Sequence, residues 1–278
     1  MTRTPDTILL AHGGGGRMAR DLLRDIVLKH FSNETLASLG DAALLNLPPG
    51  PLAFTTDSFV VNPLFFPGGD IGKLAVCGTV NDLAMAGAEP AALSCALIIE
   101  EGFPVADLEA ILESMRTVLD ECGIAVVTGD TKVVERGAAQ GLFINTSCVG
   151  VLQSAAPHGI DAVQPGDAVL VSGPVGDHGA AVLACREGLE FQGGLRSDCT
   201  PLHGPARALL NAAPGARFLR DATRGGLAAV LHELCEGRAW GLELDETAIP
   251  VREHTAALCD ILGLDPLYAA CEGAFAAV

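Results

Sequence analysis

Residues 70–90, DIGKLAVCGTVNDLAMAGAEP, constrain the fold of this chain more than any other stretch. Small and apolar residues occur all round the helix predicted there, so the helix is expected to be buried rather than amphipathic. Asn81 and Asp82 nevertheless lie in its second half. Because an isolated carboxylate in dry protein is costly, Asp82 must meet a donor, a cation or a metal ion. A cap on a neighbouring loop would also satisfy Asp82, so the helix alone leaves both interpretations open.

Composition limits the classes of function that the chain can have. Its 278 residues are enough for two domains, and 49% hydrophobic content allows a sizeable core. The formal net charge of −17 argues against nucleic acid or an anionic membrane as a partner. The nine cysteines show no CxxC pair or zinc-type spacing, and no leader or membrane-length apolar run is visible. We therefore expect a cytoplasmic protein with reduced cysteines.

A run of four glycines marks the first segment, residues 1–39. It follows His12 and precedes a helix predicted over 19–31. Regular structure is costly for such a run, so it is either a flexible linker or a place where backbone amides approach a phosphate. No Gly-Lys-Ser/Thr follows, which excludes a P-loop. We predict a flexible, glycine-rich segment with its helix, in which His12, Gly13 and Gly14 are candidate nucleotide contacts.

Strands and helices follow one another over residues 40–153, which indicates a first domain of α+β type with one covered sheet. Thr55, Thr56 and Asp57 interrupt the apolar pattern of its first strand, and polar residues in such a strand usually face a site. The buried helix lies between the first two strands, and an amphipathic helix lies between the next two. The expected strands are 51–61, 92–102, 124–127 and 143–152, and the amphipathic helix is 105–123.

Prolines and turn-forming residues predict a linker at 153–165, followed by a second α/β domain over 165–278. A short strand there ends at Asp221, and Gly225 and Gly226 open a helix. The amides of these glycines can bind a phosphate, although a plain N-cap by Asp221 or Thr223 explains the same residues. The final residues read as a strand without a following turn or polar tail, so we expect this domain to be incomplete at its C-terminus.

Four isolated aspartates share one setting, since each lies at a strand end or in the buried helix, beside Thr or Gly. They are Asp57, Asp82, Asp130 and Asp221. Mg²⁺ suits them because it binds carboxylates together with phosphate oxygens. The sequence therefore predicts one shared pocket in which Mg²⁺ and glycine amides hold ATP without a Walker motif. Lys132, beside Asp130, is a phosphate contact, a base or a solvated lysine.

Four strings in this order resemble the PurM-type superfamily of ATP-dependent enzymes, which includes aminoimidazole ribonucleotide synthetase, selenophosphate synthetase and thiamine-phosphate kinase. They are TTDS (55–58), GKLAVCGTVNDLAMAGA (72–88), TGDTK (128–132) and DATRGG (221–226). Within the superfamily the chain is most similar to the HypE family of hydrogenase maturation proteins. That likeness is carried by AHGGGG, DSFVVNPLFFPGGDIGKLAVCG, GDTKVVERGAA, FINT and VSGPVGDHG.

The resemblance implies a two-domain PurM-like fold with ATP between the domains, and a homodimer whose first-domain sheets form a barrel. It implies that the four aspartates hold Mg²⁺, with Asp70 as a weaker candidate. The residues that it implies as nucleotide contacts are Asn81, Gly129, Thr131, Thr223, Gly225 and Gly226.

The resemblance also implies an activity. HypE-type proteins accept a carbamoyl group on a C-terminal cysteine and use ATP to dehydrate the thiocarboxamide to a thiocyanate, which supplies cyanide to the iron of [NiFe]-hydrogenase. The implied partners are the carbamoyltransferase HypF and the iron-carrying HypC–HypD complex. Lys132 and Glu272 are the candidate bases. Glu272 lies in an apolar stretch, where the pKa of an acid is raised. The other interpretation of Glu272 is a surface acid at a strand end.

Two features depart from the family pattern. The Pro-Arg-Ile-Cys tail is not present, and Cys271, Glu272, Gly273 and Ala274 stand where the family commonly has Asn-Glu-Gly-Lys. We therefore expect no self-cyanation by this chain. The alternatives are a selenophosphate synthetase, disfavoured because the glycine segment has no cysteine, a thiamine-phosphate kinase, or a non-catalytic dimerising scaffold.

Overall fold

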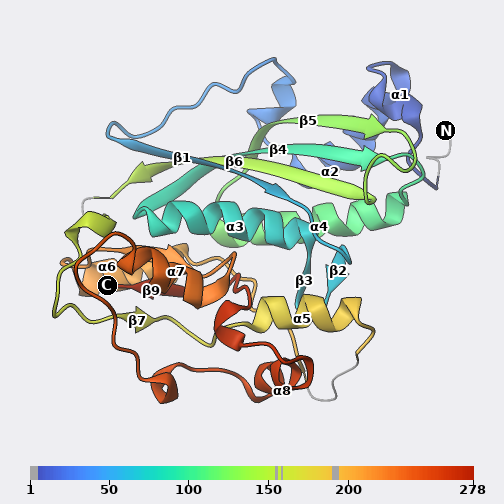
Figure 1. Ribbon diagram of the computed structural model, residues 1–278. Helices are drawn as coiled ribbons and strands as arrows, with labels where there is room; N and C mark the ends of the chain where they lie inside the picture. The colour runs from blue at the N-terminus through green and yellow to red at the C-terminus, as the bar shows by residue number, and fades with distance from the viewer. Residues whose placement is uncertain (1–5, 154–155, 158, 190–193) are drawn as a thin grey trace.

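A computed structural model describes residues 6–153, 156–157, 159–189 and 194–278. It consists of a sheet with two long helices on one face and a second, smaller α/β unit packed beneath those helices (Figure 1). Residues 1–5 of the predicted first segment and residues 154, 155 and 158 of the predicted linker lie outside the described residues.

The first sheet has the strand order β1-β6-β4-β5. β1 and β4 are both antiparallel to β6, whereas β5 is parallel to β4. The prediction of a strand over 124–127 was too short, because β5 continues through the Gly-Asp-Thr-Lys string and pairs with β4 as far as Val134. The strands are β1 (Leu52–Phe59), β4 (Ala88–Glu100), β5 (Val126–Val134) and β6 (Leu142–Leu152).

Helices α3 (Ile71–Met85) and α4 (Val105–Cys122) cover one face of this sheet. All of α3 except Lys73 and Asp82 is buried, as its unbroken apolar composition predicts. Asp70 is the N-cap of α3, since its Oδ1 accepts the backbone N–H groups of Gly72 at 2.7 Å and Lys73 at 3.0 Å. The structure therefore gives Asp70 a capping role in place of the predicted weak metal role.

The opposite face of the sheet is open along β1. Side chains of a strand point alternately to its two faces. Thr55 and Asp57 point toward α3, whereas Leu52 and Phe54 point away from it and are 53% and 71% exposed. This leaves a partly apolar strip at the β1 edge.

The N-terminal segment forms a helical layer beside β5. A 3-10 turn, Leu10–Gly13, precedes a continuous helical stretch made of α1 (Arg17–Leu22), a π turn (Leu23–Val27) and α2 (Leu28–Phe31). Leu22, Ile26 and Phe31 join the main core. The stretch begins two residues before the predicted helix, at Arg17.

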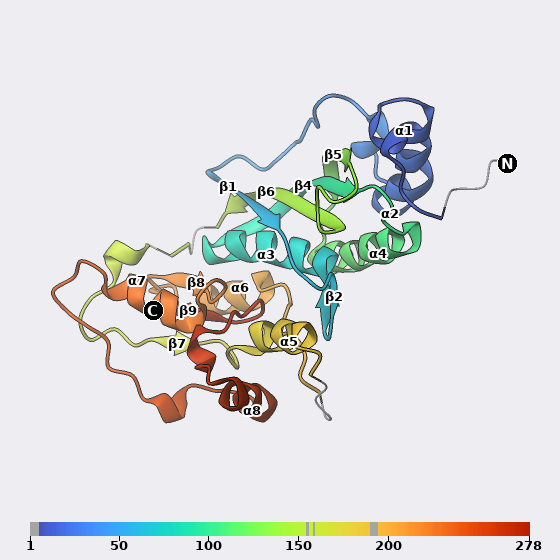
Figure 2. The same cartoon turned by 45° about the vertical axis from the view of Figure 1, so that its right-hand side comes forward.

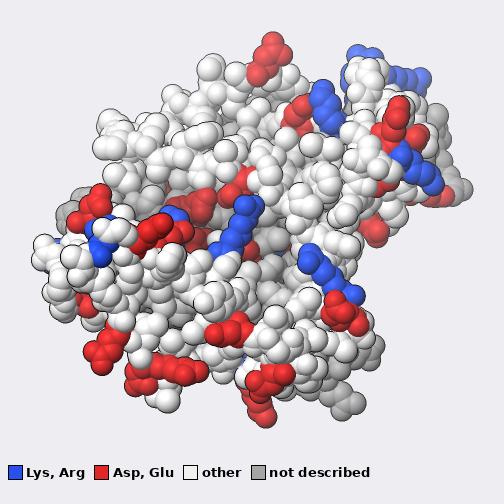
Figure 3. Space-filling view, viewed as in Figure 1, with Lys and Arg blue, Asp and Glu red and all other residues white. Residues whose placement is uncertain are grey.

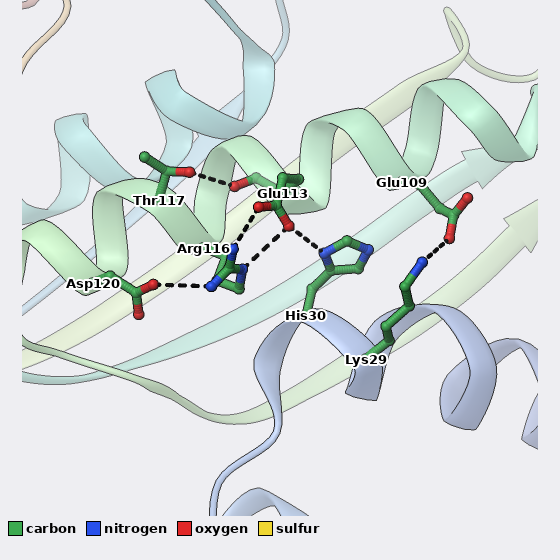
Figure 4. Close-up of polar contacts among 7 residues, drawn as sticks. All are labelled: Lys29, His30, Glu109, Glu113, Arg116, Thr117 and Asp120. Carbon is green, nitrogen blue, oxygen red and sulfur yellow. Dashed lines mark hydrogen bonds and ion pairs between the residues drawn. The ribbon is translucent and has the colours of Figure 1, made fainter.

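Polar contacts connect α2 to α4 on the surface (Figure 4). Lys29 Nζ lies 2.7 Å from Glu109 Oε1, and His30 Nδ1 lies 3.1 Å from Glu113 Oε2. The Glu113 carboxylate also pairs with Arg116, whose hydrogen bond holds the pKa of Glu113 down at about 2. The Lys29–Glu109 and Arg116–Glu113 pairs are exposed, so each contributes little to the free energy of unfolding, whereas the His30 side chain is largely buried.

Over its described residues, the second unit holds a small antiparallel sheet of order β7-β9-β8 surrounded by helices α5 to α8. Its α6 packs against the end of α3 in a cluster that includes Met85, Ala206 and Leu210. A hairpin of β2 (Phe65–Phe66) and β3 (Gly69–Asp70) leads into α3 and reaches toward α5 (Figure 2). The elements are β7 (Leu170–Val171), α5 (Asp177–Arg186), α6 (His203–Ala212), β8 (Leu219–Asp221), α7 (Gly226–Cys235), α8 (Glu253–Leu262) and β9 (Phe275–Ala277).

Among the described residues, every helix is too short or too polar to span a bilayer. All nine cysteines, each within the described ranges, are free, and several are deeply buried.

Candidate active site

A cavity of about 650 Å³, here called the interdomain cleft, lies between the two units. The first unit contributes the end of β1 and the middle of α3, and the second contributes α5, β8 and the turn before α7. Figure 3 shows acidic and basic side chains gathered along the band between these units. The charged residues that line the cleft are Asp57, Asp82, Arg186, Arg220, Asp221, Arg224, Glu233 and Glu272.

Asp57 and Asp82 form a carboxylate pair where β1 meets α3. Thr55 Oγ1 donates to Asp82 Oδ2 at 2.6 Å, which fixes the Asp82 side chain. Burial and then the Asp82 charge raise the pKa of Asp57 to about 6. Two ionised carboxylates this close repel each other, so the pair favours a shared proton or a cation. Mg²⁺ fits this donor set, because it commonly takes one or two carboxylates and completes its shell with phosphate oxygens.

Asp221 and Glu272 extend the acidic lining on the second unit. Burial and then the Asp82 charge raise the pKa of Asp221 to about 7. Burial, followed by the charges of Asp221 and Asp198, raises the pKa of Glu272 well above its ordinary value. A desolvated carboxyl group of this kind can exchange a proton near neutral pH. Glu272 is half-buried and lines the cleft, so it is not the fully exposed surface acid of the alternative interpretation.

Backbone contacts fix Glu272 in place. The two oxygens of Asp198 accept the N–H groups of Glu272 at 3.0 Å and Gly273 at 3.1 Å. A Cβ at Gly273 would lie 1.9 Å from the Asp198 carbonyl oxygen, so only glycine allows this approach. Asp198 therefore orients the predicted base.

Asn81 holds the same region from α3. It is 1% exposed, and its Nδ2 donates to the carbonyl groups of Thr200 at 3.2 Å and Glu272 at 3.3 Å. Its Oδ1 accepts the Leu202 N–H at 2.7 Å. These bonds occupy the Asn81 amide within the protein, so the structure supports an interdomain connection and not the predicted nucleotide contact.

The glycine turn before α7 also differs from the prediction. Gly225 and Gly226 have φ values of +75° and +61°, and a Cβ at Gly226 would lie 2.4 Å from the Leu267 carbonyl oxygen. The Gly226 N–H donates to the Thr223 carbonyl at 3.0 Å, so this amide is not free for a phosphate. No side chain caps the helix, which rules out the N-cap alternative for Asp221 or Thr223. Thr223 does line the cleft.

Most of the remaining predicted residues line a second cavity, of about 390 Å³, between β5 and the N-terminal helices. Asp130 and Lys132 have side chains 64% and 66% exposed, and Lys132 Nζ lies 3.7 Å from Asp130 Oδ2. Gly14 is not among its lining residues. We call this space the β5 pocket; the predicted residues that line it are His12, Gly13, Gly129, Asp130, Thr131 and Lys132.

The prediction of one shared pocket for four aspartates is wrong within a single chain. Asp57 lies opposite Thr146, Thr146 opposite Cys95, and Cys95 opposite Gly129, so this line crosses the whole sheet. Asp130 is the residue after Gly129. Three strand spacings therefore separate the β1 and β5 edges, a distance of about 14 Å.

The carboxylates do not form a complete metal site on their own. In the described part of the chain, no group of three or more His, Cys, Asp or Glu residues is arranged to hold a metal ion. Asp57, Asp82 and Asp221 line the same cleft, whereas Asp130 does not. Any Mg²⁺ held in the cleft would need oxygens from a substrate to complete its coordination.

Sequence reasoning did not identify three residues that matter to the cleft: Asp198, His178 and Arg186. Asp198 lies in a stretch without a recognisable pattern. His178 belongs to the VSGPVGDHG string, which reads from sequence as an ordinary strand–glycine–helix turn. The VSGPVGDHG string was the only sequence signal that could have pointed to His178, because the residues that contact His178 come from distant segments.

Comparison with known proteins agrees with this architecture. Residues 39–152 match the N-terminal domain of AIR synthase related proteins, and residues 164–278 match the C-terminal domain. The carbamoyl dehydratase HypE of Azotobacter vinelandii is 50% identical over 272 residues, which cover 98% of this chain and 80% of that protein.

Two solved structures extend the comparison. A crystal structure of hydrogenase maturation protein HypE in complex with ATP is 48% identical, with a TM-score of 0.93 over 98% of this chain and 81% of that one. A HypE chain in a HypE–HypF complex is also 48% identical, with a TM-score of 0.79 over 92% and 83% of the two chains. The two-domain PurM-like fold is therefore confirmed, and the chain belongs to the HypE family of AIR synthase related proteins.

Proposed function

We propose that this chain is an ATP-dependent carbamoyl dehydratase of [NiFe]-hydrogenase maturation, which converts a cysteine S-carboxamide into a thiocyanate. The buried acidic cleft around Glu272 is the observation that carries this proposal. Relatives about 50% identical are named carbamoyl dehydratases, and a relative binds ATP. The reaction needs a nucleotide phosphate site and a base in a dry environment, and the cleft offers residues for both.

The chemistry follows from the poor leaving ability of an amide oxygen. That oxygen attacks the γ-phosphorus of ATP, an O–P bond forms, and ADP leaves. The nitrogen then loses its two protons, one to Glu272 and one to an oxygen of the departing phosphate. The C–O bond breaks, and the phosphate leaves with the former amide oxygen, which yields the C≡N group. Glu272, held by Asp198 and Asn81, accepts a proton from the nitrogen, since its raised pKa makes the carboxylate a stronger base.

Asp57, Asp82 and Asp221 would hold Mg²⁺ in the cleft. The ion would neutralise phosphate charge as the γ-phosphoryl group is transferred. The carboxylates would also orient the nucleotide relative to Glu272. Arg220 and Arg224 lie beside them, and the Arg224 charge lowers the pKa of Asp57 against the effects that raise it.

A homodimer would explain why Asp130 and Lys132 lie so far from the cleft. The apolar strip of Leu52 and Phe54 on the open sheet face is a surface that a second copy can cover. A barrel of two such sheets can bring the β5 edge of one copy beside the β1 edge of the other. We propose that Asp130, Thr131 and Lys132 then complete the site of the neighbouring copy.

Mixed dimers test this arrangement directly. Asp57→Asn and Asp130→Asn homodimers should both be inactive, whereas a purified dimer with one of each should regain about half of the wild-type turnover, since one of its two sites is intact. No recovery in the mixed dimer would place both aspartates in the same copy's site and contradict the shared site.

HypF is the partner that the relatives support, because a HypE–HypF complex is known for one of them. We extend this to the HypC–HypD complex as the acceptor of cyanide, and to a cytoplasmic location, where these proteins would meet. Pull-down with each purified partner tests these assignments, and failure to bind HypF would count against the proposed pathway.

A trans assay tests the activity. The chain is mixed with Mg-ATP and a synthetic peptide that ends in an S-carboxamide cysteine. We expect ADP, phosphate and a peptide 18 Da lighter, the mass of the water lost on dehydration, and none of these products with an unmodified peptide. ATP binding without peptide turnover would favour a non-catalytic scaffold.

A further inference from the structure

His178 lies at the start of α5, where three distant segments meet at the cleft. It is 7% exposed and lines the cleft with Asp57, Asp82 and Glu272. Its ring packs edge-on against Phe66 of the β2–β3 hairpin, with the ring centroids 5.3 Å apart. Its orientation is therefore fixed by packing as well as by hydrogen bonding.

One ring nitrogen of His178 is already used. Nδ1 lies 2.8 Å from Ser197 Oγ, and the same oxygen accepts the Cys199 N–H at 3.1 Å. With that N–H donated to it, the serine hydroxyl is best placed to donate its own hydrogen to Nδ1. The proton of the neutral ring then lies on Nε2.

The surroundings keep the ring neutral and favour this tautomer. Burial and then the Arg186 charge lower the pKa of His178 to about 4. Acidic residues line the cleft, and an N–H facing carboxylates is favourable, whereas a lone pair facing them is not. His178 is thus a neutral, fixed hydrogen-bond donor that the dehydration steps above do not use.

Positive charge beside His178 makes an anion a suitable ligand. Arg186, on the same helix, also lines the cleft, and its Nε donates to the Asn62 carbonyl at 2.5 Å. This anchored guanidinium offsets part of the repulsion that an anion would meet from Asp57 and Glu272. A neutral N–H with a nearby cation resembles the donor sets that bind phosphoryl oxygens.

We propose that His178 is a further catalytic residue, whose Nε2–H binds the phosphoryl group that leaves with the amide oxygen. This inference rests on the proposed dehydration. When the C–O bond breaks, the electron pair goes to the oxygen of the leaving phosphate, and a preorganised donor stabilises that charge. His178 transfers no proton in this step. Ser197 acts through His178 as a positioning residue.

Two variants separate hydrogen bonding from packing. His178→Phe keeps a ring against Phe66 but removes the donor, and His178→Gln can offer an N–H near the position of Nε2. With the carboxamide peptide, we expect His178→Phe to lower kcat about 100-fold and His178→Gln to stay within about tenfold of wild type. The Kd for ATP should change less than threefold in both. The matched control is His232→Phe, since His232 is exposed on α7 outside the cleft and its variant should match wild type.

Inorganic phosphate gives a readout that does not require turnover. The wild-type chain with Mg-ADP should bind phosphate by calorimetry, and His178→Phe should weaken that binding at least tenfold with an unchanged thermal unfolding midpoint. Phosphate binding through His178 by a wild-type chain without dehydratase activity would refute the proposed function and support the phosphate site. Unchanged kcat and phosphate affinity in a folded His178→Phe variant would overturn the inference.

Discussion

The two edges of the first sheet carry the same residue type in different surroundings. Asp57, at the β1 edge, is covered by α3 and the second unit, and its pKa rises to about 6. Asp130, at the β5 edge, has a side chain 64% exposed beside Lys132. The comparison teaches that the chemistry of a strand aspartate is set by what packs over the edge, because desolvation depends on the covering element.

The largest expected effect is on kcat, and it compares variants of the two candidate bases, Glu272 in the cleft and Lys132 at the β5 edge. Glu272→Gln removes the half-buried base of the cleft and should lower kcat by about 10²–10⁴-fold with the Kd for ATP unchanged. Lys132→Met, at an exposed residue, should lower kcat by about tenfold. Steady-state kinetics with the carboxamide peptide checks this, and a larger loss in Lys132→Met would reverse the comparison.

The second expected effect concerns the stability of the cleft. Asn81→Ala leaves the Leu202 N–H and the Glu272 carbonyl without their side-chain partner in a buried place. We expect a loss of about 2–4 kcal/mol in the free energy of unfolding, measured with urea. Asn145→Ala is the control, since Asn145 is only partly buried at the sheet surface and should cost about 1 kcal/mol or less. Equal losses would show that Asn81 has no special part in joining the units.

The third effect is a pH dependence that compares two histidines that are buried in the described part of the chain, His178 in the cleft and His12 in the β5 pocket. The native pKa of His178 is lowered to about 4, so below about pH 6.5 the unfolded chain takes up a proton that the native ring does not. His178 therefore lowers the free energy of unfolding progressively as the pH falls from about 6.5 to about 4, and has no such effect above about pH 7.

His178→Gln should remove this cost, which reaches about 1–3 kcal/mol at the acid end of that range. Burial also lowers the pKa of His12, whose Nδ1 accepts the Leu9 N–H at 2.8 Å, so His12→Gln should act in the same direction by a smaller amount. Unfolding free energies at pH 5 and pH 7.5 measure both. A stronger pH effect of His12→Gln would contradict the larger lowering of the pKa at His178.

The smallest expected effect lies in the layer that covers the β5 edge. Lys29→Ala breaks the exposed ion pair with Glu109 and should change the free energy of unfolding by about 0.5 kcal/mol or less. A double-mutant cycle with Glu109→Ala at low and high salt measures the coupling. A coupling above about 1 kcal/mol would show that polar contacts hold the N-terminal helices in place, in contrast to the packed interface beside the cleft.

Several features could be predicted from local patterns. The buried α3 follows from apolar residues all round a helix, and the amphipathic α4 follows from its spacing. Strand β1 was predicted from its alternating apolar pattern. The polar residues that interrupt this pattern predicted a nearby site, and Asp57 does line the cleft. The length of β5 was not predictable, because Gly129 and Asp130 are poor strand formers that stay in the strand only through pairing with β4.

The sequence by itself determined the family, the two-domain fold and the identity of the acids, because these depend on long strings and short-range periodicity. Only the tertiary structure decided which acids share a cleft, that Asn81 connects the units, that His178 lines the cleft, and that Asp198 supports Glu272. The reason is physical: burial, hydrogen-bond partners and electrostatic neighbours come from segments distant in the chain, and these set the pKa of a side chain and decide what it can bind.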